Sequence, residues 1–515
     1  MLPDESILPS YHTAPMASAI PDSSAACSHC PMSSIGPSKV PEASAVPSPT
    51  SKRLLPWLVA VAFFMESLDT TILNTAVPTI SAALHVGPLS MKAVLASYTL
   101  SLAVFIPISG WVADRFGTRR VFATAIGLFT LGSFLCGISS NIHLLVACRI
   151  LQGCGGSMMV PVGRLTLVRT FAKSELLRTM SFVSIPALIA PMLGPIAGGL
   201  IVGYLHWRVI FFLNIPIGLI GLILVYIHLP DYREVTHPLD KVGLILFGSG
   251  IALLSYVLEV FGEHTLSAGE ISGLLVLSLA LLAGYWLHAK SLTYPLLQLS
   301  LFKIRTFRAA VSGSFFTRLG IGGVPFLLPL LYQVGLGFSP VQSGLLIMPQ
   351  ALAAICMKTA MPRILSAMGY RWVLISNTTI LGLLLLLFAT IGLYTPVWII
   401  VLQAFFYGAF TSLQYTSMNT LVYADTTDRE SSAASSIAST MQQMSISFGV
   451  ASAGLATAFF VPHSGQSAPS DMIQGIHKAL VALGILTIVS TIVFRSLKRG
   501  DGDAVSHQKV FHPGG

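Results

Sequence analysis

Apolar stretches of about 20 residues follow one another almost without interruption from Leu54 to Phe494. A helix of that length, rising about 1.5 Å per residue, crosses the hydrocarbon core of a bilayer, which is about 30 Å thick. In the whole chain 54% of residues are hydrophobic and 10% are charged, and the mean hydropathy is +0.77, so a sizeable soluble domain is excluded. Runs such as residues 380–393 are solidly apolar, which favours helices over a membrane β-barrel. The sequence therefore predicts an all-α membrane protein.

We predict about fourteen membrane-spanning helices. Their expected ranges are 55–78, 92–113, 120–139, 142–163, 178–203, 207–229, 241–261, 271–289, 307–332, 339–361, 371–393, 396–420, 432–461 and 474–496. Segment 178–203 contains Pro186, Pro191 and Pro195. Membrane helices tolerate proline where neighbouring groups satisfy the freed carbonyls, so this segment is kept as a helix.

Basic residues gather in alternate connections between these helices. The residues that fall on one side are Lys52, Arg53, Arg115, Arg119, Arg120, Arg164, Arg169, Lys173, Arg178, Arg233, Lys241, Lys290, Lys303, Arg305, Arg308, Arg363, Arg371, Arg495, Lys498 and Arg499. The other side holds almost only Lys92, Arg208 and Lys478. Because short cytoplasmic loops collect Lys and Arg, both termini are expected in the cytoplasm. The net charge of +9 then indicates anionic membrane lipid as a partner and not nucleic acid.

The N-terminal segment, residues 1–53, is rich in Pro, Ser and Ala, and we expect a disordered cytoplasmic tail there. Its Cys27-Ser28-His29-Cys30 sequence has no second pair nearby, so a metal site is not expected. The other cysteines fall within predicted helices and are expected to be reduced packing residues. No cofactor is predicted.

The most specific motif lies between the second and third predicted helices and reads Gly110-Trp-Val-Ala-Asp114-Arg115-Phe-Gly117-Thr-Arg119-Arg120. Gly110 is one turn from Asp114 and would let another helix approach, and Gly117 would allow a tight reversal. An acid at a helix C-terminus opposes the helix dipole, so Arg115 or Arg119 is expected to hold Asp114. The pattern resembles the signature loop of the major facilitator superfamily, which implies that these residues, with Arg120, form an inner gate. The alternative is an ordinary basic loop with a turn glycine.

The first predicted helix carries two carboxylates, Glu66 and Asp69, three residues apart and therefore on nearly the same face. Carboxylates inside a membrane span are costly and indicate function. The sequence Leu68-Asp-Thr-Thr-Ile-Leu-Asn74-Thr-Ala-Val-Pro78 resembles the signature of the fourteen-helix drug:proton antiporter branch, the EmrB/QacA family. The resemblance implies that Asp69 carries protons. Glu66 either assists or contacts a cationic substrate, and the alternative for Asp69 is a packing role with local Thr and Asn groups.

A third motif, Arg149-Ile-Leu-Gln152-Gly153-Cys-Gly155-Gly156, places an arginine, an amide and two glycines on one helix face. It resembles the intramembrane-arginine motif of the superfamily, which implies that Arg149 tunes a nearby carboxylate; snorkelling to the interface is the alternative. Asn74, Gln152 and Arg318 are expected in the substrate cavity, where Arg318 would pair with Asp69 or with an anionic substrate group. Lys358 is expected to snorkel.

The fifth predicted helix carries Pro191 and the sequence Gly194-Pro195-Ile-Ala-Gly198-Gly199. Prolines bend a helix and glycines let it pack closely, which suits an element that rocks or seals between two states. The sequence resembles the motif that marks antiporters in the superfamily. A permanently kinked structural helix is the alternative.

The resemblance covers residues 54–496 and implies the major facilitator fold, with two pseudo-symmetric six-helix bundles at 54–230 and 307–496. Residues 231–306 would add two further helices, and residues 497–515 would form a cytoplasmic tail. The second half has only an echo of the gate loop, from Pro362 to Arg371, without an acid that corresponds to Asp114.

The predicted function is export of small, amphipathic or drug-like organic molecules across the bacterial inner membrane in exchange for protons, by alternating access. No Gly-x-x-x-x-Gly-Lys-Ser/Thr sequence occurs, so an ion gradient is expected to supply the energy. The alternatives are an uptake symporter for a small nutrient and a non-transporting membrane sensor. An enzyme is not expected. The expected partners are the substrate, protons and lipid, and a periplasmic adaptor protein is left open.

Overall fold

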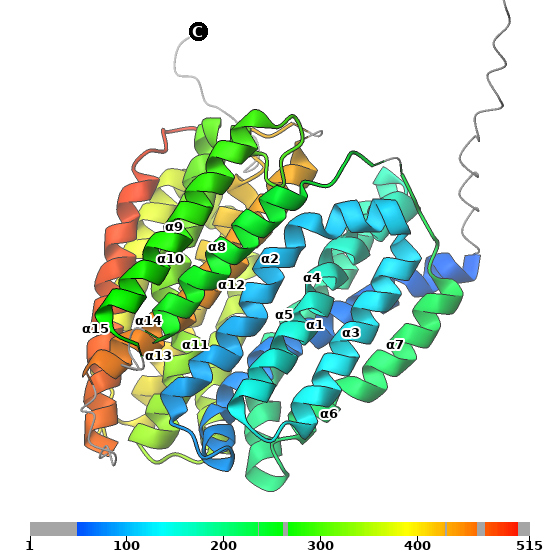
Figure 1. Cartoon of the computed structure of the whole chain (residues 1–515). Coiled ribbons are helices and arrows are strands. Elements are labelled where there is room, and N and C mark those ends of the chain that lie inside the picture. Colours follow the sequence, from blue (N-terminus) through cyan, green and yellow to red (C-terminus); the bar gives the residue numbers. More distant parts are fainter. Residues whose placement is uncertain (1–48, 235, 261–265, 428–429, 461–468, 503–515) are drawn as a thin grey trace, which may run out of the picture. The chain divides into compact units, whose positions relative to one another are not determined.

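The computed structural model describes residues 49–234, 236–260, 266–427, 430–460 and 469–502, and these residues are helical almost throughout (Figure 1). The first group of helices is α1 (Pro49–Ala83), η1 (Pro88–Met91), α2 (Lys92–Phe116), α3 (Thr118–Ile138), α4 (Ile142–Thr170), α5 (Lys173–Tyr204), α6 (Val209–Phe212) and α7 (Asn214–His228). The hairpin α8 (Lys241–Val260) and α9 (Ala268–Ser291) follows. The remaining elements are η2 (Leu299–Lys303), α10 (Arg305–Ile321), α11 (Val324–Leu330), η3 (Leu331–Gly335), α12 (Pro340–Phe388), α13 (Val397–Leu421), α14 (Ser431–Phe460) and α15 (Pro469–Phe494). The all-α membrane fold predicted from the sequence is confirmed. Cys27 and Cys30 lie outside the described residues, as do most of the predicted N-terminal tail and most of the C-terminal tail.

Twelve helices among the described residues are long and apolar enough to cross a membrane. That number counts α12 once, although its 49 residues rise about 74 Å, more than twice the core thickness of about 30 Å. The helix is broken at Gly369, with φ 72° and ψ 159°, between the two spans predicted there. The predicted helix at 178–203 is present as α5. The count of fourteen spans stays a prediction.

Two predicted helices are interrupted. The segment predicted at 207–229 is divided into α6 and α7, and the segment predicted at 307–332 is divided into α10, α11 and the π-helical turn η3. The second break lies at Gly322 and Gly323, between α10 and α11, and Pro325 has no N–H to donate to the carbonyl of Ile321. The hydroxyl of Tyr407 on α13 donates to that carbonyl at 3.3 Å. A side chain therefore replaces the missing backbone bond.

The α8–α9 hairpin is fastened at one end by Asp240, which precedes α8. The Asp240 carboxylate accepts hydrogen bonds from His288 Nε2 at 2.8 Å and from the backbone N–H groups of Gly243 and Leu296 at 2.7 and 3.1 Å. Burial acts to raise the pKa of the Asp240 carboxyl, but these hydrogen bonds lower it below its usual range. Their stabilising effect is therefore present above pH ~3.9 and is lost as the pH falls through the lowered pKa.

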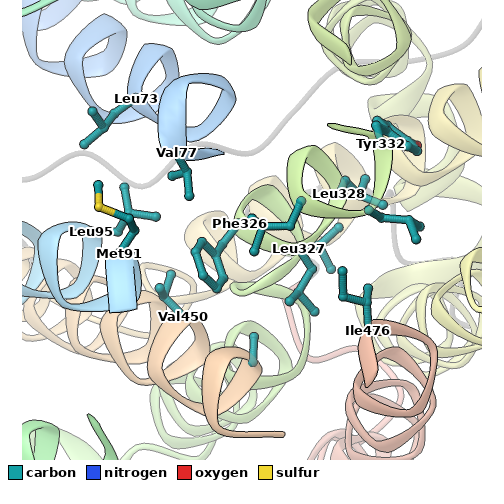
Figure 2. Close-up of a cluster of buried hydrophobic side chains, with 14 of the residues drawn as sticks. Leu73, Val77, Met91, Leu95, Phe326, Leu327, Leu328, Tyr332, Val450 and Ile476 are labelled. Carbon is teal, nitrogen blue, oxygen red and sulfur yellow. The ribbon is translucent and has the colours of Figure 1, made fainter. Parts of the chain in front are cut away.

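The buried apolar side chains form three clusters. One belongs to the N-terminal helices and includes Phe63, Phe122 and Phe129, and another belongs mainly to α8–α15 and includes Phe307 and Phe494. The third joins the N-terminal helices to the C-terminal ones. Figure 2 shows its central residues, which we call the seal: Leu73, Val77, Met91, Leu95, Phe326, Leu327 and Val450. The seal lies at the end of the bundle where α1 passes through η1 into α2.

Candidate functional site

A cavity of about 430 Å³ lies between the N-terminal and C-terminal helices. Its walls include Thr71, Asn74 and Thr75 of α1, Pro191 and Pro195 of α5, Gln350 and Lys358 of α12, and Tyr407, Tyr415 and Asn419 of α13. Leu328 lines the cavity and also belongs to the apolar cluster that contains the seal. The cavity is therefore bounded on one side by that cluster and extends toward the C-terminal end of α13. A volume of this size suits a small organic ligand.

Helix α1 serves two sites at once. Thr71, Asn74 and Thr75 line the cavity, whereas Asp69 is only 2% exposed and is absent from the cavity wall. Asp69 instead contacts α4 and α7. One helix therefore connects the wall of the cavity with a buried carboxylate.

Three side chains donate hydrogen bonds to the Asp69 carboxylate. Arg149 Nη1 lies 2.5 Å from Oδ2, and Gln152 Nε2 lies 2.8 Å from Oδ1. Asn214 Nδ2 also donates to Oδ1, at 3.0 Å. Gln152 accepts a further bond from Arg149 Nη1 at 2.7 Å. Every member of this network is at most 2% exposed, so the charges are removed from water and balance each other.

Two more side chains complete the network. The hydroxyl of Ser133 accepts hydrogen bonds from Gln152 Nε2 at 2.7 Å and from Asn214 Nδ2 at 3.2 Å. The guanidinium carbon of Arg149 lies 4.2 Å from the ring centroid of Tyr98, a cation–π contact. The arginine is thus held from both sides and does not snorkel.

Glu66 has a different environment from Asp69, although it lies less than one turn away on α1. Its side chain is half-buried, and the buried Oε2 atom has no hydrogen-bond partner among the described residues. A buried carboxyl oxygen without a donor is costly when charged. The two carboxylates of α1 are therefore unequal, one held by three donors and the other short of a partner.

The partner of Asp114 differs from the prediction. Arg169 at the end of α4 donates to Asp114 Oδ1 at 2.8 Å and also pairs with Glu234 at 2.7 Å. The prediction of Arg115 or Arg119 as partner is wrong, because Arg115 points into solvent and Arg119 donates to the Leu229 carbonyl. The cluster ties together the ends of α2 and α4 and the segment after α7.

Of the two glycines of this loop, one has the predicted role and the other does not. Gly117 has φ 96°, a conformation that favours glycine, so the predicted tight reversal between α2 and α3 is present. The close helix approach predicted at Gly110 is not present, since a Cβ there would meet nothing within 4 Å. Gly110 is exposed, and Arg120 is exposed on the α2–α3–α4 side of the bundle.

Helix α5 packs closely on both sides through its small residues. A Cβ on Gly194 or Gly198 would collide with Thr71 and Ile72 of α1. A Cβ on Gly199 would collide with the backbone of Pro340 at the start of α12, and one on Gly344 with the backbone of Pro195. The stripe therefore joins α5 to a C-terminal helix as well as to α1.

Arg318 does not pair with Asp69. Its guanidinium carbon lies 3.5 Å from the ring centroid of Tyr415, and its Nε donates to Ser314 at 3.0 Å. The Asp69 carboxylate accepts its hydrogen bonds from Arg149, Gln152 and Asn214. The predicted pairing of Arg318 with Asp69, one of two possibilities, is therefore wrong. Among the predicted cavity residues, Asn74 lines the cavity, whereas neither Gln152 nor Arg318 contributes to its wall. Lys358, expected to snorkel, lies on the cavity wall.

Several residues of these sites carried no predicted role, among them Asn214, Arg169 and Tyr415. Asn214 was identifiable as an amide inside an apolar run, and Arg169 as a second cation near the gate loop. Tyr415 gave no signal, because one aromatic residue in an apolar helix resembles any other packing residue.

The family model of the Major Facilitator Superfamily matches residues 59–450, which span all the helices that build the cavity and the Asp69 network. The chain belongs to the major facilitator superfamily. This match confirms the resemblance found in the motifs. With its membrane-spanning helices, the chain is a multi-pass membrane protein. Members of this superfamily are membrane transporters and not enzymes.

Curated relatives in the superfamily are similar over most of their length. The protein named "Putative multidrug resistance protein MdtD" from Serratia proteamaculans (strain 568) is 43% identical over 407 residues, which are 79% of this chain and 85% of that protein. The protein of the same name from Escherichia coli O81 (strain ED1a) is 42% identical over 412 residues, 80% of this chain and 88% of that protein.

Solved superfamily structures share the fold at low sequence identity. A POT family transporter in complex with 5-aminolevulinic acid aligns with a TM-score of 0.62 and 16% identity, over 86% of this chain and 95% of that one. The human organic anion transporter MFSD10 (TETRAN) aligns with a TM-score of 0.56 and 13% identity, over 87% and 100%. These likenesses establish the fold alone.

Proposed function

We propose that the protein is a proton-coupled antiporter that exports small organic, drug-like molecules by alternating access. Its relatives named as multidrug resistance proteins support the kind of cargo. The observation that supports proton coupling is the position of Asp69. Its carboxylate is buried against Arg149 of α4, and Asp69 belongs to α1, whose other residues line the cavity. A proton that binds there changes a contact of the helix that also supplies part of the cavity wall.

The free energy of the Asp69–Arg149 pair is large enough to couple protonation to a change between two arrangements of the helices. Protonation of Asp69 removes the negative charge and leaves Arg149 buried without compensation, which costs about 3–5 kcal/mol. Moving a two-state equilibrium from 1:99 to 99:1 takes about 5.5 kcal/mol. A single protonation therefore supplies a large part of the free energy that separates two arrangements of α1 and α4.

The position of the seal indicates which end of the bundle is closed in this arrangement of the helices. At that end the two groups of helices also share hydrogen bonds, from Gln333 Nε2 to the Thr75 carbonyl at 2.9 Å and from Ser447 to the Ala96 carbonyl at 3.1 Å. Alternating access requires these contacts to open while the other end closes. The gate cluster of Asp114, Arg169 and Glu234 lies away from the seal, where it can stabilise one of the two arrangements.

The proposed location is the bacterial inner membrane, with both termini in the cytoplasm. The alternation of basic connections supports this orientation. The cavity would then open toward the cytoplasm, where an exporter collects its substrate.

Flux through proteoliposomes that contain the purified full chain tests the proposal. Amphipathic fluorescent dyes of either charge sign serve as probes, with and without an imposed pH gradient. We expect dye to move against the direction of the protons and to stop moving when the gradient is collapsed. Movement in the same direction as the protons would identify an uptake symporter, and an absence of any gradient-dependent flux would refute proton coupling.

A further inference from the structure

The charge of the cavity wall points to a substrate class. Lys358 is the one charged side chain among the described residues that line the cavity, and no carboxylate is among them. Its side chain is exposed into this space, and no ion pair or hydrogen bond to a described residue holds its ammonium group. The wall thus presents positive charge and no negative charge.

A second cation acts through an aromatic ring. Tyr415 lines the cavity, and Arg318 lies behind it with its guanidinium carbon 3.5 Å from the ring centroid. One of the two electron-rich faces of the ring is therefore already used by a protein cation, whose charge also weakens the attraction of the other face for a cationic ligand. The remaining face is better suited to a neutral or anionic aromatic group.

A hydrogen-bond donor is also available. The amide nitrogen of Gln350 is buried and has no partner among the described residues, and the residue is part of the cavity wall. Gln350 and Lys358 are about two turns apart on α12, and both residues line the cavity. Both groups donate, which suits an anion or a carbonyl oxygen.

We propose that the cavity binds small organic anions with an aromatic or apolar body, and that Lys358 holds the anionic group while Gln350 donates to a further acceptor. This inference rests on the proposed transport function and names its substrate class. Exchange of a proton for such an anion moves net positive charge in the direction of the proton. The membrane potential then adds to the pH gradient as a driving force.

Matched probes test the sign of the preferred charge. Naphthalene-2-sulfonate and 2-naphthyltrimethylammonium share an aromatic body and carry opposite charges. Their binding to the purified full chain is measured by equilibrium dialysis, without any proton gradient. We expect the sulfonate to bind about ten-fold more tightly than the ammonium compound.

The variants assign that preference to one side chain. Lys358→Met should remove the roughly ten-fold preference and Lys358→Arg should keep it, because only the second retains a cation. Lys303→Met, which removes a lysine outside the cavity, is the matched control and should change neither affinity. Tighter binding of the ammonium probe, or equal anion affinity in wild type and Lys358→Met, would overturn the inference.

The two proposals fail in different measurements. Anion binding that depends on Lys358, together with a lack of gradient-driven flux, would refute the transport proposal and leave the binding site in place. Gradient-driven flux that is lost in Asp69→Asn, together with binding indifferent to Lys358, would refute the anion site alone.

Discussion

The N-terminal and C-terminal helices each contain a buried polar cluster, but only the N-terminal one is charged. Around Asp69 and Arg149 a full ion pair is held by two amides. In the C-terminal helices, Asn377 Nδ2 donates to Gln414 Oε1 at 2.7 Å, and Gln414 Nε2 donates to Thr378 at 2.7 Å. These C-terminal residues are at most 2% exposed and carry no charge.

The difference shows how one fold can divide its tasks. A neutral amide cluster can fix helix packing but cannot take up a proton at physiological pH. A carboxylate–arginine pair contains a titratable acid, and neutralising one partner of a buried pair costs several kcal/mol. The C-terminal cations are not members of the neutral cluster: Lys358 lines the cavity, and Arg318 contacts the ring of Tyr415. In the antiport proposed above, proton coupling belongs to the N-terminal helices and charge recognition to the C-terminal ones.

The largest effect is expected from Asp69→Asn, which keeps the shape of the side chain and removes its charge. Arg149 is then buried without compensation, so the free energy of unfolding should fall by about 3–5 kcal/mol. Flux driven by a pH gradient should fall to that of protein-free vesicles. Thermal unfolding and proteoliposome flux measure the two effects.

A double variant separates stability from coupling. Asp69→Asn combined with Arg149→Gln removes both charges and should recover much of the lost stability, but it should not recover gradient-driven flux. If the single and double variants both export against a gradient, the proton site lies elsewhere.

Asp114→Asn should have the next largest effect. The Asp114–Arg169 pair is partly exposed, at 26% and 16%, so its loss should change the free energy of unfolding by less than about 1 kcal/mol. A shift of that size in the balance between two transport states still alters their ratio about five-fold, and flux should fall accordingly. Glu234→Gln removes the more exposed partner of Arg169, at 62%, and should have a weaker effect. Normal turnover in Asp114→Asn would remove the gate cluster from the mechanism.

Glu66→Gln should act on the proton count more than on stability. Its Oε2 atom lacks a partner, so the neutral amide should be tolerated with a stability change below about 1 kcal/mol. If Glu66 assists Asp69, fewer protons should be exchanged per substrate, as read from simultaneous pH-dye and substrate measurements. Loss of coupling in Glu66→Gln while Asp69→Asn retains it would show that the carrier is the other carboxylate.

The smallest effect on transport is expected in the neutral cluster. Asn377→Leu leaves the Gln414 Oε1 atom without its donor and should lower the free energy of unfolding by about 1–3 kcal/mol. The number of protons exchanged per substrate should stay that of the wild type. A changed proton count in this variant would contradict the division of tasks between the two groups of helices.

The helical membrane fold could be predicted from the sequence because each span has to bury its own backbone hydrogen bonds. Helix ends and breaks were harder to predict. At the interruption between α10 and α11, the carbonyl of Ile321 accepts a hydrogen bond from the hydroxyl of Tyr407, which comes from another helix. The break at Gly369 lies within a chain that continues as a helix on both sides. Such features depend on tertiary contacts that no local pattern contains.

The site residues show the same limit. A motif identified Asp69 and Arg149 separately, and their pairing followed once α1 and α4 were in contact. The partner of Asp114 was mistaken because cations close in sequence were preferred, whereas Arg169 comes from the end of another helix. Gln152 was assigned to the cavity, but its amide is used by Asp69, and only the packing of four helices reveals that.

The seal also determines where the electric field of the membrane falls. Its apolar side chains exclude water at one end of the bundle, while the cavity on the other side of Leu328 contains polar side chains among its apolar ones. A voltage drops mainly across the layer that holds the least water and the fewest mobile ions. Each elementary charge that crosses that layer changes the free energy by about 2.3 kcal/mol per 100 mV. A charged ligand should therefore reach Lys358 nearly independently of voltage, and the electrical work should appear in the step that parts Val77 from Phe326.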